Sequence, residues 1–324
     1  MQNSVSVIIP VYNSEKYLKR TLNSLKNQTF KNFEIICIND CSTDNSLKIL
    51  TEFQDRRLKI INNEQNLGAA LSRNRGLELS RGKYIYFLDS DDYIDEKYLE
   101  VMVQKAEQTK ADIILNLSVF SQTNGVETQY FHPSLPVIKT DGEYLDNISV
   151  IHNAPCFIWA RLYRKSFLDK YELKFPDIQT AEDVAFNTIS AIQTNKNYLF
   201  YGEKYHYSVN QSGLTGTVTI DNNRDLQHIK AYSLIYDYLK EHNLSFDSLK
   251  LFRVYPFFKV DSKEKFNSYK EFFVKIKDDF LKCENIYNDL EKYFAFSVLN
   301  SQNYDDYLKN YNPVVTIGFL RKRK

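Results

Sequence analysis

Short apolar runs alternate with segments of helical periodicity along roughly the first 120 residues. These runs, which are rich in β-branched residues, lie at residues 5–10, 33–38, 58–61, 84–88 and 112–117. Side chains that are apolar at consecutive positions are typical of strands covered on both faces, as in a parallel sheet. The runs therefore predict buried parallel strands.

Between the runs, apolar positions recur every three or four residues, which predicts helices packed on one face. The segments with this pattern are residues 14–25, 42–53, 69–79 and 96–108. Ser14 begins the first segment, and Ser42 or Thr43 the second, as residues that favour helix N-caps. Strands that alternate with helices through short connections predict βαβ units. We therefore predict an α/β fold with a doubly wound, mostly parallel sheet flanked by helices.

The pattern changes farther along the chain. It weakens over residues 120–146, where turn formers gather. Helical segments are then predicted at 159–168 and 181–191, and short strands at 198–202 and 205–209. Beyond residue 222 the chain is dense in Tyr, Phe and Lys with helical spacing. We predict an α/β domain over residues 1–220 and a helical C-terminal region over residues 221–324 that ends in a basic tail.

Composition narrows the class of function. With 42 basic and 41 acidic side chains the formal net charge is +1, so no global positive field favours nucleic acid as a partner. No apolar run approaches the roughly 18 residues of a membrane span, and the start of the sequence lacks the features of a signal peptide. The 4 cysteines show no C-x-x-C spacing, which favours reduced thiols over disulfides or zinc. We expect a soluble, cytoplasmic protein.

Polar side chains follow the first four predicted strands at their carboxyl ends. The segments concerned are 10–13, 39–44, 66–68 with Arg73 beyond it, and 89–92. In open α/β sheets, ligands bind beyond the carboxyl ends of the strands. A purely structural sheet would not need polar groups at every such end, so their convergence predicts a binding site at this edge.

Three carboxylates, Asp89, Asp91 and Asp92, directly follow a buried strand. They repel one another, and a divalent cation that prefers oxygen ligands, Mn²⁺ or Mg²⁺, would neutralise them. A turn and a helix cap would also explain these residues, since Asp favours both. The polar strand ends beside them favour the metal site, with Asp91 and Asp89 as its ligands.

Asp40 allows two interpretations: a turn or helix cap, or a group that accepts a hydrogen bond from a base or a ribose hydroxyl. The sequence contains no G-x-G-x-x-G after the first strand and no G-x-x-x-x-G-K-[ST]. These absences disfavour a Rossmann dinucleotide site and a P-loop. Phosphates would then be held by a metal and by side chains such as Arg73.

The ordered motifs resemble the family-2 glycosyltransferases with the GT-A fold, over roughly residues 4–215. They lie at residues 5–13, 28–30, 39–44, 66–68, 70–76 and 87–92. The resemblance implies that Asp40 contacts the nucleotide base and that the segment around Pro10 and Tyr12 lines the nucleotide. Residues 1–220 would then form the domain that binds the nucleotide-sugar and the acceptor.

The same resemblance assigns the diphosphate side of the site. It implies that Asp89 and Asp91 bind the ribose and the metal–diphosphate, with Asp91 as the more direct metal ligand. Asn66, Gly68 and Arg73 complete the predicted donor-binding set.

The segment 181–186 resembles the later E-D motif of the family, which implies that Asp183 is the general base. The acceptor hydroxyl must lose a proton as it attacks the anomeric carbon, and such bases contribute on the order of 10²–10⁴-fold. Without the resemblance, Glu182 and Asp183 would read as acids that favour a helix N-terminus. We interpret Glu182 as a supporting residue.

Several residues keep open interpretations. His206 would either approach the diphosphate or metal, or pack in a strand. Trp159 is either a platform for a sugar or part of the core. Arg161 and Arg164 resemble basic positions of the family without an assigned role.

The resemblance implies an inverting, metal-dependent hexosyl- or N-acetylhexosaminyltransferase. It would move a sugar from a nucleotide-sugar, with a UDP-sugar expected, to a glycan or lipid-linked acceptor of bacterial surface polysaccharide, lipooligosaccharide or glycoprotein glycan. A sugar-1-phosphate nucleotidyltransferase is the alternative enzyme, although its Gly-rich signature is absent. A non-catalytic nucleotide-sugar binding module is a further alternative, which Asp91 and Asp183 disfavour.

The chain ends in Arg321-Lys-Arg-Lys324, preceded by two apolar residues. Four cations near an anionic leaflet predict reversible, salt-sensitive binding. We therefore expect peripheral contact with the inner face of the cytoplasmic membrane, with a solvated tail as the alternative.

Overall fold

The computed structural model describes most of the chain. The described residues are 4–123, 126–129, 142–145, 157–194, 196–208, 223–244, 260–282, 287 and 289–311. The chain divides into two compact units, Met1–Gly213 and Leu214–Lys324. The domain boundary predicted near residue 220 lies outside the described residues, as does the basic tail.

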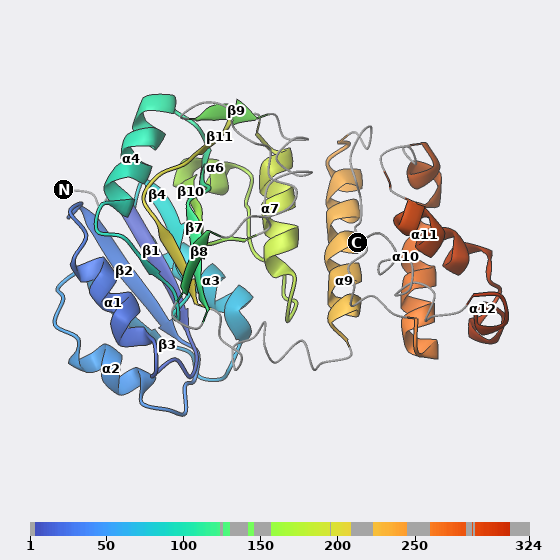
Figure 1. The fold of residues 1–324 in the computed structure, drawn as a ribbon, viewed down its shortest axis with the longest axis horizontal. Helices are drawn as coiled ribbons and strands as arrows, with labels where there is room; N and C mark the ends of the chain where they lie inside the picture. The colour runs from blue at the N-terminus through green and yellow to red at the C-terminus, as the bar shows by residue number, and fades with distance from the viewer. Residues whose placement is uncertain are drawn as a thin grey trace. The chain divides into compact units, whose positions relative to one another are not determined.

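A large mixed sheet forms the centre of the first unit (Figure 1). Its order is β3 (Leu58–Asn62), β2 (Phe33–Asn39), β1 (Val5–Val11), β4 (Tyr84–Phe87), β10 (Arg161–Arg164), β6 (Ile113–Asn116), β11 (Asn197–Phe200) and β9 (Glu143–Leu145). The strands β3, β2, β1 and β4 are parallel, and β6 and β11 are parallel to each other, whereas β10 and β9 are antiparallel to their neighbours. The predicted α/β class and mostly parallel sheet are confirmed.

The first strands are buried along their whole length, as their continuous apolar runs predict. Every residue of β2 is buried, and in β1 only Pro10 is partly exposed. The edge strand β3 is partly exposed. Helices cover the sheet: α1 (Leu18–Lys26), α2 (Ser46–Glu52), α3 (Gly68–Leu79), α4 (Tyr98–Thr109), α6 (Lys165–Lys170) and α7 (Glu182–Ile192).

Helix α3 packs closely on the sheet because Gly76 has no side chain. A Cβ atom at this position would lie 2.4 Å from Cγ2 of Ile8 in β1. Such a contact is too short, so any larger residue would push the helix away from the strand. Gly76 therefore permits the close approach of α3 to β1.

The helix predicted over residues 159–168 is wrong in its first half. Residues Arg161–Arg164 form β10, which is inserted between β4 and β6, and only Lys165–Lys170 are helical. The pairing of Leu162 with Tyr86 and Ile114 buries it on both sides. Pairing with strands distant in the sequence overrides the local helical preference here.

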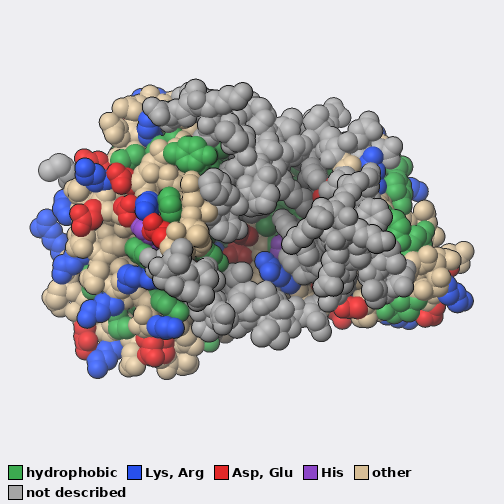
Figure 2. Space-filling model, in the orientation of Figure 1, with side chains coloured by type: hydrophobic (Ala, Val, Ile, Leu, Met, Phe, Trp, Pro, Cys, Tyr) green, Lys and Arg blue, Asp and Glu red, His purple; other side chains and the backbone are tan. Residues whose placement is uncertain are grey.

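A second, four-stranded sheet has the order β5 (Tyr93–Ile94), β12 (Tyr205–Ser208), β7 (Val119–Thr123) and β8 (Val126–Gln129). The strands predicted near residues 198 and 205 are confirmed as β11 and β12. The sequence pattern did not indicate β5, β7 or β8. Charged side chains of both signs are scattered over the face of this unit in view (Figure 2).

The described part of the second unit is helical, as predicted. Its helices are α9 (Arg224–Glu241), α10 (Lys263–Lys282), α11 (Asp289–Asn300) and α12 (Tyr304–Asn310). Lys265 of α10 is buried and lies 3.0 Å from the buried carboxylate of Asp225 in α9. Within the described residues, none of the helices combines the length and apolar character that crossing a membrane requires.

Candidate active site

The register of the parallel strands brings the predicted polar segments to one edge of the sheet. Val11 at the end of β1 lies opposite Asn39 at the end of β2, and Asn39 lies opposite Asn62 at the end of β3. The backbone N–H of Asp40 donates to the carbonyl of Val11 over 2.8 Å. The carboxyl ends of these strands therefore meet, as the sequence predicts.

Asp40 is buried and holds the turn that leads into α3. Its carboxylate accepts hydrogen bonds from the side chain of Asn63 at 2.7 Å and from the backbone N–H groups of Leu67 and Gly68, each at 2.8 Å. Asn66 donates from its side chain to the carbonyl of Asp40 at 3.3 Å. The structure therefore brings three predicted binding residues together and gives Asp40 a turn-stabilising role. Its contact with a base stays a prediction.

This turn depends on Gly68. Gly68 has a φ of +83°, a backbone conformation that residues with a Cβ rarely adopt. The carboxylate of Asp40 also lies at the N-terminus of α3, where the helix dipole favours negative charge. Sequence reasoning missed Asn63, although it follows β3 in the same way that Asp40 follows β2.

The segment after β1 lies beside this turn. Tyr12 is 50% exposed, so its ring is accessible to a ligand. Asn13 has a positive φ of 47° and accepts a hydrogen bond from the backbone N–H of Thr43 at 2.8 Å. Ser14 donates from its backbone to the Ser46 hydroxyl at 2.8 Å. These contacts hold the segment after β1 against the loop between β2 and α2 and against the start of α2, with Pro10 still inside β1.

The three acids after β4 have different environments. Asp92 is buried and accepts hydrogen bonds from the Tyr205 hydroxyl at 2.5 Å and from the backbone N–H of Ser208 at 2.7 Å. Burial, followed by the nearby charges of Asp91 and Asp89, raises the pKa of Asp92 well above its usual range. Asp92 therefore anchors this loop to β12, whereas Asp89 and Asp91 are partly exposed.

Arg20 of α1 supports the same loop. Its guanidinium donates to the backbone carbonyl of Asp91 at 2.8 Å and to the Ser208 hydroxyl at 2.6 Å. It also lies over the ring of Tyr93, 4.4 Å from the ring centroid. No local sequence pattern predicts this role of Arg20, because it depends on a contact between a helix and a distant loop.

Arg73 of α3 joins two of the predicted motifs. One nitrogen of its guanidinium donates to Asp89 at 2.9 Å and another donates to Glu182 at 2.8 Å. The side chain of Arg73 is buried, which opposes its charge, but the two carboxylates more than offset this effect and raise its pKa. Arg73 is thus committed to protein carboxylates, and direct contact with a phosphate stays a prediction.

Asp183 lies in the first turn of α7, next to Glu182 in the sequence. Ala181, directly before the helix, has a φ of 65°. Desolvation raises the pKa of Asp183 to about 7, and the charge of Glu182 adds to this effect. The charges of Arg73 and Asp89 also reach Asp183, with opposite signs. A carboxyl group with a pKa near neutrality is suited to accept a proton in a reaction.

The acids of this site do not form a complete metal cage. Among the residues that the structure describes, no group of three or more His, Cys, Asp or Glu side chains could hold a metal ion. The oxygen donors of Asp89 and Asp91 still fit Mg²⁺ or Mn²⁺, since such ions commonly use one or two carboxylates together with substrate phosphates and water. The donor set therefore fits a cation that is shared with a phosphate-bearing ligand.

His206 and Trp159 pack inside the first unit. His206 stacks on Tyr93 with 4.2 Å between ring centroids, and its nitrogens lie 2.7 Å from Asp95 and 3.2 Å from Glu127. Trp159 stacks on Tyr205 at 4.3 Å and is 7% exposed. His206 therefore packs in a strand, and Trp159 is part of the core.

The two arginines that follow Trp159 are also held by the protein. Arg161 is buried and donates to the carbonyl of Phe157 at 3.2 Å. Arg164 donates to the carbonyl of Ala111 at 3.0 Å. Both contacts fix the ends of the inserted strand β10.

The sequence and the fold of this protein are similar to those of known glycosyltransferases. The sequence profile described as "Glycosyl transferase family 2" matches residues 6–171. Glycosyltransferase GlyA of Streptococcus pneumoniae serotype 4 is 33% identical, over 66% of this chain and 32% of its own length. The putative glycosyltransferase EpsH of Bacillus subtilis is 33% identical, over 65% of this chain and 62% of its own. The chain thus spans between about a third and two thirds of these relatives.

Two proteins of Staphylococcus aureus extend the comparison. The poly(ribitol-phosphate) beta-N-acetylglucosaminyltransferase TarP is 30% identical, over 72% of this chain and 71% of its own. The crystal structure of residues 1–349 of TarS in complex with UDP has a TM-score of 0.70 at 21% identity, and the match covers 99% of this chain and 92% of that one. The structural likeness shows that the two share the GT-A fold.

Proposed function

Since the chain belongs to glycosyl transferase family 2, we propose that it is an inverting, metal-dependent glycosyltransferase. It transfers a hexosyl or N-acetylhexosaminyl group from a UDP-sugar to a bacterial surface glycan or a lipid-linked acceptor. The observation that carries this proposal is the bridge from Arg73 to Asp89 and Glu182. This bridge joins the loop that carries Asp89, Asp91 and Asp92, the aspartate-rich loop, to helix α7, which carries Asp183. The residues proposed to bind the sugar donor and the proposed proton acceptor therefore lie in one site.

The donor half of the site is built at the ends of β1 and β2. In this proposal Tyr12 and Pro10 line the nucleotide, and Asp40 orders the turn at Asn66 and Gly68 against which it binds. A UDP-sugar is supported by the TarS structures, which are described as complexes with UDP and UDP-GlcNAc.

Asp91 and Asp89 would hold a Mn²⁺ or Mg²⁺ ion at the donor site. When bound, the ion would offset the negative charge that develops on the departing diphosphate. Arg20 holds the aspartate-rich loop through the backbone carbonyl of Asp91, and Asp92 holds the same loop through its contact with β12. Arg73 fixes the orientation of Asp89.

Asp183 performs the proton transfer in this account. Its carboxylate takes the proton from the acceptor hydroxyl while the oxygen attacks the anomeric carbon. An attack from the side opposite to the diphosphate inverts the configuration at that carbon. Because burial raises the pKa of Asp183 to about 7, its carboxylate is a stronger base than that of an ordinary Asp.

The acceptor is proposed to be a cell-surface polymer or its lipid-linked precursor. TarP and a poly(ribitol-phosphate) beta-glucosyltransferase of Bacillus spizizenii are named for such an acceptor, and the latter is 31% identical over 64% of this chain. Synthesis from nucleotide-sugars would place the protein in the cytoplasm, with contact to the inner face of the membrane through the basic tail.

The experiment that tests the proposal is a donor screen. The protein is incubated with a panel of nucleotide-sugars, and release of the free nucleotide is measured with Mn²⁺, with Mg²⁺ and with a chelator. We expect metal-dependent hydrolysis of at least one UDP-sugar. Formation of a nucleotide-sugar from a sugar-1-phosphate would favour a nucleotidyltransferase instead. Binding of UDP without any turnover would favour a non-catalytic module.

A further inference from the structure

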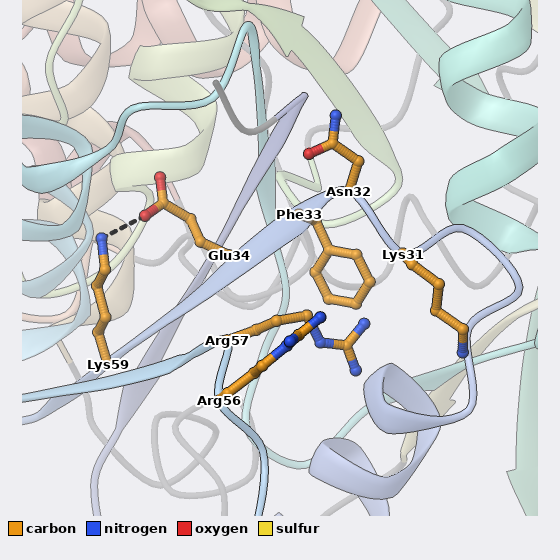
Figure 3. Close-up of a pocket in the computed structure, with 7 residues that line it drawn as sticks. All are labelled: Lys31, Asn32, Phe33, Glu34, Arg56, Arg57 and Lys59. Atoms are coloured by element: carbon orange, nitrogen blue, oxygen red, sulfur yellow. Dashed lines mark hydrogen bonds and ion pairs between the residues drawn. The ribbon is translucent and has the colours of Figure 1, made fainter. Parts of the chain in front are cut away.

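A basic pocket lies at the amino ends of β2 and β3. It has a volume of ≈ 330 Å³ and is lined by Lys31, Asn32, Phe33, Glu34, Arg56, Arg57 and Lys59 (Figure 3). Asp40 and the candidate active site follow the opposite end of β2, and a strand of seven residues is about 23 Å long. A ligand in this pocket is therefore separate from the donor site.

Positive charge exceeds negative charge around the pocket. Of its four cations, Lys59 pairs with Glu34 at 2.5 Å and Arg57 pairs with Asp55 at 2.6 Å. Within the described part of the chain, neither Lys31 nor Arg56 forms an ion pair, and both side chains belong to exposed residues. The pocket is left with two cations that no described carboxylate neutralises.

Arg57 is held in a fixed orientation. Asp55 accepts hydrogen bonds from two of its nitrogens, Nε at 2.9 Å and Nη2 at 2.6 Å, and the guanidinium carbon lies 4.2 Å from the centroid of the Phe33 ring. The third nitrogen, Nη1, is buried and has no hydrogen-bond partner among the described residues. Asp55 and Phe33 therefore fix the position of this guanidinium at the pocket.

Figure 3 shows the side chains of Arg56 and Arg57 on the same side of the Phe33 ring, with Lys31 to one side and the Lys59–Glu34 pair to the other. Guanidinium groups match the oxygens of a phosphate with two parallel hydrogen bonds, and a lysine adds a mobile point charge. We propose that this pocket binds a phosphate group of an anionic ligand, carried either by a membrane phospholipid or by a soluble phosphate compound.

The test compares two variants with the same change in net charge. The pocket variant is Lys31→Gln/Arg56→Gln. The control is Lys48→Gln/Lys110→Gln, which removes two lysines that are 68% and 69% exposed on α2 and after α4. One arm titrates inorganic phosphate by calorimetry at constant ionic strength. The other measures co-sedimentation with vesicles of phosphatidylcholine, with and without phosphatidylglycerol.

We expect wild type and control to bind alike and the pocket variant to bind about 10- to 30-fold more weakly, since each cation contributes about a fivefold factor near an anionic surface. If the pocket variant binds inorganic phosphate more weakly, a soluble phosphate group is sufficient as the ligand. If it loses binding only to the vesicles, the ligand is a lipid headgroup. Absence of binding by wild type in both arms, or an equal loss in the control, overturns the proposal. Donor hydrolysis, measured in parallel, is expected to be the same in all three proteins, so this test is independent of the proposed activity.

Discussion

Glu182 accepts a hydrogen bond of 2.8 Å from Arg73, across 109 positions of the sequence. The same guanidinium holds Asp89, so the acid that precedes Asp183 is tied to the aspartate-rich loop. A single buried cation therefore fixes two motifs relative to each other. The negative charge of Glu182 also acts on Asp183, whose pKa it raises.

Replacement of Glu182 by Gln should change the pH dependence of transfer more than its maximum. Gln keeps an oxygen that can accept from Arg73 but removes the charge that raises the pKa of Asp183. The pKa of Asp183 should then fall, and the acidic limb of kcat/KM should move to lower pH. Profiles of wild type and Glu182→Gln are compared between about pH 5 and 9. An unchanged limb, or one that moves to higher pH, would contradict the assignment of Asp183 as the base.

Asp183 should also affect stability in a pH-dependent way. Its pKa is raised to about 7 in the folded protein, so the folded state favours the protonated acid and loses stability as the pH rises from the unfolded pKa of about 4 to 7. Asp183→Asn has no such charge. Its Tm should therefore exceed that of wild type at pH 8, and the difference should shrink as the pH falls toward 4. Equal differences at every pH would show that burial does not perturb this carboxyl group.

Two neighbouring acids should respond differently to removal. Asp91→Ala should abolish metal-dependent activity and leave Tm nearly unchanged, because Asp91 is partly exposed. Asp92→Ala should lower Tm, because it leaves the buried Tyr205 hydroxyl and the Ser208 N–H without their acceptor. Each unsatisfied group costs about 1–3 kcal/mol. Activity of Asp91→Ala in the presence of a chelator would remove the basis for the metal site.

Much of the fold follows from local patterns in the sequence. The buried runs of β1 and β2 predict their strands directly, because strands covered on both faces are apolar at most consecutive positions. The polar strand ends predict that Asp40 and Asp89 lie at the same edge of the sheet, because parallel strands end at one edge. The assignment of Asp183 as the general base, in contrast, rests on a family resemblance, since an acid pair at a helix start is common for electrostatic reasons alone.

Long-range contacts account for what the sequence did not predict. Leu162 lies in a strand because it pairs with residues of both β4 and β6, which are distant in the sequence. No local pattern encodes this pairing. The contact of Arg73 with Glu182 joins residues 109 positions apart, so no local pattern predicts it. Asp92 belongs to the same run of acids as Asp89 and Asp91, and only its contacts with β12 show that it anchors the loop.

The most direct test of the account compares wild type with Asp183→Asn on the UDP-sugar that the donor screen identifies. UDP affinity is measured by calorimetry with Mn²⁺, and sugar transfer by release of UDP in the presence of acceptor. We predict nearly equal UDP affinity and a transfer rate about 10²-fold or more below that of wild type, because only the proton acceptor is lost. Loss of UDP binding in the variant, or transfer at close to the wild-type rate, would contradict it.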